Sequence, residues 1–285
     1  MSTPLFSELV SSTHPAAGYI GGKRKLARQI CAAIDRLPHR TYVEVFMGMG
    51  GIFLRRTRAA PSEVINDLSE DVSTFFRVLQ RHYIAFLDML RFQVTSRSGF
   101  EKLAALDPAS LTDLERSARF LYLQRLSYGG KGTNRSFGVD PVSPAGFDMT
   151  KIPPLLEALH ERLAPVTIER LSWEELIPKY DHAQALFYLD PPYYGSEGDY
   201  GASLFNRSHF HRMAKLLASI EGTFLLSLND HPDVRAIFAD FAMCEFEVKY
   251  SVGGGDKQVD ARELVISNLE QAKLDQVLAV RAGGR

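Results

Sequence analysis

Residues 41–51 read TYVEVFMGMGG, a short run of β-branched and aromatic residues that leads into a cluster of glycines. Such a run is typical of a buried strand, and the glycines that follow it are typical of a tight turn. We therefore expect a strand over Thr41–Phe46, a turn at the glycines and the start of a helix over Ile52–Arg58. A glycine-rich turn after a strand lets the backbone approach a ligand closely.

Further strands alternate with helical patterns along the chain. The expected strands are Glu63–Asp67, Leu186–Asp190, Thr223–Asn229, Cys244–Tyr250 and Glu263–Asn268. This alternation indicates an α/β fold with a doubly wound, mostly parallel, Rossmann-like sheet. The last two strands follow each other without a helix, which predicts an antiparallel strand at the sheet edge.

The middle of the chain interrupts the alternation. Helical spacing extends over residues 68–92, 113–126 and 153–163. Residues 96–111 are expected to be loop-rich. Tyr128–Pro144 is rich in Gly, Ser and Pro, which predicts a long loop that is either functional or disordered. We therefore expect one domain from residues 1–70 and 166–285, with residues 71–165 as an inserted, mainly helical domain.

Composition limits the class of protein. The formal net charge of the 285 residues is −1, and the two cysteines exclude a disulfide framework or a four-thiolate zinc site. The sequence has no secretory signal pattern and no apolar run long enough to span a membrane, so we expect a cytoplasmic protein. His209 and His211 lack partners at metal-ligand spacing, so no metal site is expected. The oligomeric state stays open.

Basic residues are nevertheless unevenly distributed. Residues 1–60 hold nine Lys and Arg against three acids, and residues 116–139 hold five basic residues and no acid. If the fold brings these two segments together, they form a basic face suited to nucleic acid.

Three predicted strand ends carry the side chains best suited to chemistry, because open α/β sheets bind ligands at the carboxyl ends of their strands. The first is the glycine turn, and the second is Asp67, which can accept hydrogen bonds from ribose hydroxyls. The third is Asp190-Pro191-Pro192-Tyr193. Its prolines stiffen the backbone, so a carboxylate and a carbonyl offer two acceptors to an exocyclic amine, and Tyr193 offers a ring for stacking on a base.

These motifs, in this order, resemble the S-adenosylmethionine-dependent, Dam-like DNA adenine-N6 methyltransferases. Tyr19-Ile20-Gly21-Gly22-Lys23 is similar to the segment that opens that family, and the resemblance spans roughly residues 18–268. The family usually has Pro at the place of Val45, Gly at that of Met49 and Lys at that of Gly18.

The resemblance implies a role for each matching residue. S-adenosylmethionine is the implied cofactor, and double-stranded DNA with a flipped adenine is the implied substrate. The implied catalytic residues are Asp190, Pro191, Pro192 and Tyr193. The implied cofactor-binding residues are Tyr19, Lys23, Phe46, Gly48, Gly50, Asp67 and Asp190. Candidate DNA contacts in the basic stretch are Arg116, Arg119, Arg125, Lys131, Asn134 and Arg135.

Other functions remain open from the sequence. The motifs also suit a methyltransferase that acts on cytosine N4 or on RNA, or a DNA-binding homologue with impaired catalysis. A nucleotide-dependent dehydrogenase is disfavoured because Phe53 replaces the last glycine of the dinucleotide fingerprint. The sequence does not reveal the recognition site, or whether the gene belongs to a restriction–modification system or a phage.

Overall fold

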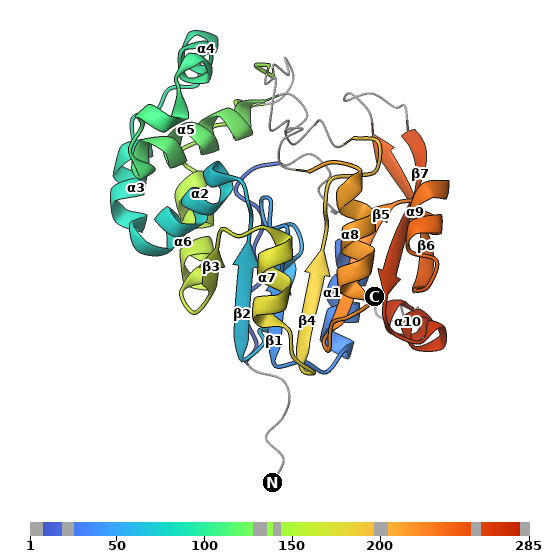
Figure 1. Ribbon diagram of the computed structural model, residues 1–285. Helices are drawn as coiled ribbons and strands as arrows, with labels where there is room; N and C mark the ends of the chain where they lie inside the picture. The colour runs from blue at the N-terminus through green and yellow to red at the C-terminus, as the bar shows by residue number, and fades with distance from the viewer. Residues whose placement is uncertain are drawn as a thin grey trace, which may run out of the picture.

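A seven-stranded sheet forms the centre of the molecule (Figure 1). The computed structural model describes residues 8–18, 26–127, 136–138, 144–196, 205–251 and 258–279. The strands are β1 (Thr41–Glu44), β2 (Ser62–Asn66), β3 (Thr167–Glu169), β4 (Ala185–Leu189), β5 (Thr223–Asn229), β6 (Ala242–Ser251) and β7 (Gln258–Ser267), and their order in the sheet is β3-β2-β1-β4-β5-β7-β6.

The first five strands are parallel, and β7 is antiparallel to both β5 and β6. The prediction of a mostly parallel α/β sheet is confirmed. The late strand pair does lie at the sheet edge, but β6 is the outermost strand and the antiparallel β7 lies one place inside it.

The central strands form because their side chains are apolar on both faces. Leu186 and Tyr188 of β4 enter the hydrophobic core on one face of the sheet. Phe187 and Leu189 enter the core on the other face. This alternation with a period of two explains why every residue of β4 is buried.

Helices cover both faces of the sheet (Figure 1). Helices α1 (Ala27–Arg36) and α10 (Gln271–Leu278) contact each other and lie on one face. Helices α7 (Trp173–Tyr180), α8 (Ser208–Leu217) and α9 (Pro232–Ile237) lie on the other. In the part of the chain that is described, no helix combines the length and hydropathy of a membrane span.

Among the described residues between β2 and β3, five α-helices form what we call the helical unit, which lies beyond the β3 end of the sheet in Figure 1. They are α2 (Glu70–Arg81), α3 (Tyr83–Leu90), α4 (Arg97–Ala105), α5 (Asp113–Leu126) and α6 (Ile152–Leu163). The ring of Phe75 in α2 lies 6.0 Å from that of Phe86 and 5.7 Å from that of Phe120. These aromatic contacts join α2, α3 and α5, and their core is continuous with one face of the sheet.

Two predicted elements were wrong. Residues 96–111 contain α4, which forms because Ser96 caps it by accepting a hydrogen bond from Gly99 N–H and because Phe100 is buried. The helix expected over Ile52–Arg58 is only a 3₁₀ turn, Phe53–Arg55. That turn ends at Arg56, whose guanidinium is buried in an ion pair with Glu63 at 2.7 Å.

Candidate active site

The turn after β1 places two glycines in the left-handed backbone region. Gly48 has a φ of 49° and Gly50 a φ of 78°. A Cβ at Gly50 would lie 2.7 Å from Met47 Cε and 2.8 Å from Leu54 Cδ1. The Gly50 N–H donates to the Met47 carbonyl at 2.8 Å and closes the turn. Position 50 therefore requires glycine both for its conformation and for its close packing.

Asp67 lies directly beside this turn. Its Oδ2 accepts a hydrogen bond from Gly48 N–H at 2.8 Å, and its Oδ1 accepts one from Ser69 N–H at 2.9 Å. Burial raises the pKa of Asp67 to about 6, although both backbone hydrogen bonds act to lower it. The fold thus brings together two of the residues that the sequence singled out, from strand ends 19 residues apart.

Asn66, the last residue of β2, fastens the neighbouring strand ends together. Its Nδ2 donates to the Val45 carbonyl at 2.9 Å and to the Leu171 carbonyl at 3.0 Å. Its Oδ1 accepts from Leu171 N–H at 2.8 Å. Sequence reasoning missed this residue, because its partners are 21 and 105 positions away.

Asp190 follows β4 and is held by a buried hydroxyl. Ser227 Oγ of β5 donates to Asp190 Oδ1 at 3.2 Å and lies 3.0 Å from the Tyr188 hydroxyl. Ser227 is fully buried, and the two prolines that follow Asp190 are also buried. The carboxylate therefore sits on a rigid backbone and is oriented from the neighbouring strand.

Tyr193 and Tyr194, which follow the two prolines, are held by hydrogen bonds to side chains of β5 and β7. The Tyr193 hydroxyl donates to Glu263 Oε1 at 2.8 Å. The Tyr194 N–H donates to Asn229 Oδ1 at 2.9 Å, and Asn229 Nδ2 donates to the Tyr194 carbonyl at 3.0 Å. Burial, with the charges of Asp190 and Glu263, holds the pKa of Tyr193 far above its usual range, so its phenol stays protonated.

A second carboxyl group, that of Glu44 on the neighbouring strand β1, is close enough to Asp190 to interact with its charge. Glu44 of β1 pairs in register with Tyr188 of β4, is 1% exposed and accepts a hydrogen bond from the Tyr42 hydroxyl at 2.7 Å. Burial raises the pKa of Glu44 to about 8, and the nearby charge of Asp190 acts in the same direction. The raised pKa favours the neutral form of Glu44, which limits the negative charge beside Asp190.

Aromatic side chains border the end of β1. The Phe46 ring meets that of Phe205 edge-on, with centroids 6.0 Å apart, and the Phe205 ring lies 4.8 Å from that of His209. Trp173 Nε1 donates to His209 Nδ1 at 3.3 Å. Of these residues, only Phe46 was predicted from the sequence to bind the cofactor.

A family model described as D12 class N6 adenine-specific DNA methyltransferase matches residues 19–252, which is most of the chain. The chain belongs to this family. It is an adenine-N6 DNA methyltransferase, and enzymes of the D12 family use S-adenosylmethionine as the methyl donor. The matched range includes Gly48, Asp67 and Asp190.

Two relatives extend this similarity. The type II methyltransferase M.CviBI of Paramecium bursaria Chlorella virus NC1A is 20% identical over 236 residues, covering 80% of this chain and 89% of the viral protein. The type II methyltransferase M1.LlaDCHI of Lactococcus lactis subsp. cremoris is 23% identical over 273 residues, covering 89% of this chain and 95% of the bacterial protein.

The ends of β1 and β2 in this D12 methyltransferase fit S-adenosylmethionine. Because Gly50 has no side chain, the turn can pack tightly, and a Cβ at this position would collide with its neighbours. The Asp67 carboxyl group stands beside the turn, at the strand end where α/β proteins bind ribose hydroxyls. In the described residues no group of three or more His, Cys, Asp or Glu side chains could hold a metal ion.

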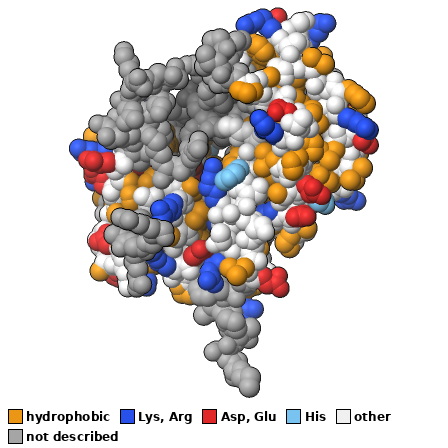
Figure 2. Space-filling model, turned by 180° about the vertical axis from the view of Figure 1, so that it is seen from behind, with side chains coloured by type: hydrophobic (Ala, Val, Ile, Leu, Met, Phe, Trp, Pro, Cys, Tyr) orange, Lys and Arg blue, Asp and Glu red, His pale blue; other side chains and the backbone are white. Residues whose placement is uncertain are grey.

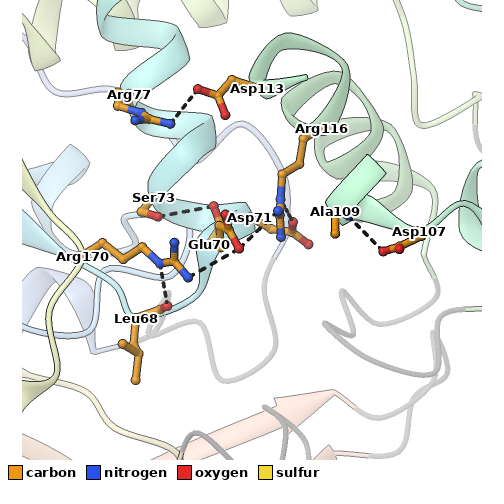
Figure 3. Close-up of polar contacts among 10 residues, drawn as sticks. All are labelled: Leu68, Glu70, Asp71, Ser73, Arg77, Asp107, Ala109, Asp113, Arg116 and Arg170. Atoms are coloured by element: carbon orange, nitrogen blue, oxygen red, sulfur yellow. Dashed lines mark hydrogen bonds and ion pairs between the residues drawn. The ribbon is translucent and has the colours of Figure 1, made fainter. Parts of the chain in front are cut away.

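Figure 3 shows Arg116, a candidate DNA contact, engaged within the D12 enzyme itself. Its Nε lies 2.6 Å from Asp71 Oδ1 and its Nη1 lies 3.2 Å from Glu70 Oε2. Arg170, which follows β3, also reaches Glu70 at 3.4 Å. These ion pairs join the start of α2, three residues after Asp67, to α5 and to the chain beyond β3.

Two more candidate DNA contacts have intramolecular partners. Arg119 is buried, and its guanidinium donates to the carbonyl groups of Leu103 and Ala104 at the end of α4. Arg125 donates to the Gly146 carbonyl at 2.8 Å. Contacts with phosphate groups stay a prediction for these arginines. The remaining candidates lie outside the described residues, namely Tyr19, Lys23, Lys131, Asn134 and Arg135.

A basic surface would gather the Lys and Arg side chains on one face of the molecule, and Figure 2 draws one face. Figure 2 shows Lys and Arg side chains on that face interspersed with acidic and hydrophobic ones rather than gathered into a patch. Large apolar side chains are also exposed at Ile84 of α3 and at Phe92 and Val94 in the connection from α3 to α4. The described residues on the face in Figure 2 therefore do not gather into a continuous basic surface.

Proposed function

We propose that the protein methylates N6 of an adenine that has been flipped out of double-stranded DNA. The reaction takes place at the carboxyl ends of β1, β2 and β4. The observation that carries this proposal is the rigid Asp190–Tyr193 segment, whose carboxylate is oriented by Ser227 and whose phenol is fixed by Glu263. A target base inside a duplex is inaccessible to such a segment, so the base must leave the stack.

The proposed mechanism assigns the two N6 protons to two acceptors. S-adenosylmethionine supplies an activated methyl group when it is bound. The Asp190 carboxylate and the Pro191 carbonyl accept hydrogen bonds from the amine and orient its lone pair. Both hydrogen bonds strengthen as positive charge develops on N6, which stabilises the transition state. Asp190 then accepts the proton that the methylated amine loses.

The other site residues bind and position. Asp67 accepts hydrogen bonds from the ribose hydroxyls of the cofactor, and Gly48 and Gly50 allow the backbone to approach it. Phe46, together with Tyr19 and Lys23 of the opening motif, completes the proposed cofactor site. Tyr193 stacks on the flipped base.

We assign target recognition to residues 71–165, which include the helical unit. Lys131, Asn134 and Arg135 are the proposed contacts to DNA, and the enzyme would act on DNA in the cytoplasm. The proposal for Lys131 is supported by its place in a stretch of the sequence with five basic residues and no acid.

A single incubation tests the catalytic assignment. Purified protein, labelled S-adenosylmethionine and unmethylated DNA are incubated, and the nucleosides are separated by mass after digestion. We expect N6-methyladenine with the wild type and with Asp240→Ala, which removes an exposed acid after α9. We expect none with Asp190→Ala, although that variant still binds DNA. Methylation by Asp190→Ala would refute the role of Asp190. N4-methylcytosine in the wild-type digest would show that the target base is cytosine and not adenine.

A further inference from the structure

Strands β5 and β7 present a row of polar side chains to the Asp190–Tyr193 segment. Ser227 and Asn229 are two residues apart on β5, so their side chains project from the same face of the sheet. Asn229 pairs in register with Glu263 of the antiparallel β7, and side chains of directly opposed residues also share a face. Ser227, Asn229 and Glu263 each bond to a different residue of the segment from Asp190 to Tyr194.

Glu263 makes the most distant of these contacts along the chain. It is 1% exposed, and its Oε1 accepts the Tyr193 hydroxyl at 2.8 Å from a residue 70 positions away. A hydrogen bond to a carboxylate is roughly twice as strong as one between neutral groups. The pKa of Tyr193 lies far above its usual range, so the phenol keeps the hydrogen that it donates to Glu263.

The contact fixes the far end of the Tyr193 ring. Its near end is attached to a backbone held by two buried prolines on one side and by the paired hydrogen bonds of Asn229 on the other. A tyrosine side chain has two torsions, and its hydroxyl oxygen lies on the axis of the second. Anchoring the hydroxyl therefore fixes the first torsion and the direction of the ring axis, and because a phenol O–H lies close to the ring plane, the position of the acceptor also restrains rotation of the ring. Glu263 of β7 thus restrains the orientation of a ring in the segment that follows β4.

We propose that Glu263 is a positioning residue for the target base, which it orients through the Tyr193 ring. This inference rests on the proposed role of Tyr193 as the stacking partner of the flipped adenine. A displacement of about 1 Å in the position of a reacting group can slow a reaction about 100-fold. A tilted ring shifts the adenine, and with it N6, relative to Asp190 and the methyl donor. Glu263 therefore affects the rate of transfer without contacting substrate or cofactor.

A double-mutant cycle between Glu263 and Tyr193 tests the inference. We expect Glu263→Leu to lower the single-turnover rate of methyl transfer roughly 10- to 100-fold, the equivalent of one lost hydrogen bond to a charged group. We expect Tyr193→Phe to lower it similarly, and the double variant to be no slower than the slower single variant, because both changes remove the same contact. Cofactor affinity, measured by calorimetry, should stay within about twofold of the wild type, since Glu263 acts on the base and not on the cofactor.

Conservative variants separate positioning from a general loss of structure. Glu263→Gln keeps an oxygen that can accept the phenol hydrogen, so it should retain the rate to within about fivefold. Glu263→Asp keeps the charge, but its shorter side chain moves the acceptor oxygen away from the Tyr193 hydroxyl, so it should slow transfer as Glu263→Leu does. It replaces Glu263→Leu in the test if the leucine variant fails to fold. Glu247→Leu, at an exposed site on the neighbouring β6, is the matched control and should leave the rate unchanged.

The outcomes distinguish the two levels of the proposal. The positioning role would be overturned if Glu263→Leu or Glu263→Asp slowed transfer by the same factor in the Tyr193→Phe background as in the wild type. A wild-type rate in both Glu263 variants would also overturn it. Wild-type rates in both Tyr193→Phe and Tyr193→Ala would instead refute the proposed stacking role of Tyr193, whatever Glu263 does.

Discussion

Replacing Asp67 with Asn removes a negative charge at the point where the cofactor ribose is proposed to bind. Burial moves the pKa of Asp67 from 3.8 to about 6. The folded protein therefore binds this proton more tightly than the unfolded chain, and its unfolding free energy falls as the pH rises from 3.8 to about 6. By pH 8 the charged carboxylate costs at most about 3 kcal/mol, of which cofactor hydroxyls would recover part on binding.

This linkage gives a measurable pH dependence of cofactor affinity. S-adenosylmethionine should bind best when Asp67 is ionised, so its dissociation constant should be constant above pH 7 and about tenfold higher at pH 5. Asp67→Asn should bind about 5- to 150-fold more weakly at pH 8, which corresponds to about 1–3 kcal/mol of lost hydrogen bonding. Its affinity should not change between pH 5 and pH 8.

Titration calorimetry from pH 5 to pH 8 measures these constants, and urea denaturation at each pH checks that the variant is folded. Asp88→Asn, an exposed position on α3, is the control and should follow the wild type. A wild-type affinity that is equal at pH 5 and pH 8, or a pH dependence that survives in Asp67→Asn, would refute the assignment of Asp67 to the cofactor.

Three further changes test the packing around the site. Ser227→Ala should lower the unfolding free energy in urea by about 1–3 kcal/mol, because it leaves buried polar groups without this partner, and should slow methyl transfer more than it weakens cofactor binding. Gly50→Ala should lower the thermal midpoint, since left-handed backbone alone costs about 1–2 kcal/mol outside glycine, whereas Gly18→Ala, with no atom within 4 Å of its Cβ, should not. Glu63→Gln should lower the unfolding free energy in urea by about 3–5 kcal/mol, because it removes the charge between two buried arginines. Arg162→Met leaves the Arg56–Glu63 pair, which is neutral overall, and should lower the unfolding free energy by less.

The sequence was most informative where a strong local pattern coincided with burial. The alternation of strand and helix patterns predicted the mostly parallel sheet, and the short apolar runs of β2 and β4 predicted the strand ends that carry Asp67 and Asp190. The three-residue β3 was missed because so short a strand has no readable alternation. Helix α4 was missed because a single buried phenylalanine and one capping serine stabilise it.

The contacts that complete the site could not be predicted from local patterns. Ser227 and Glu263 reach Asp190 and Tyr193 from 37 and 70 residues away, and only the strand order brings them together. The charge pattern also hid the partners of Arg116, because the acids that bind it lie on α2, about 45 positions earlier. A basic segment in a sequence therefore identifies charges but not where they are neutralised.

The place of β7 in the sheet has a consequence for biosynthesis. Strand β5 lies between β4 and β7, with its central residues buried, so it remains an open sheet edge until β7 leaves the ribosome. An emerging chain thus displays unpaired backbone groups along β5, which makes it prone to aggregation. Strand β7 both pairs with the open edge of β5 and brings Glu263 to Tyr193. The sheet and the active site are therefore completed at nearly the same point in translation. Chains truncated before residue 258 should accumulate as insoluble material rather than as weakly active enzyme.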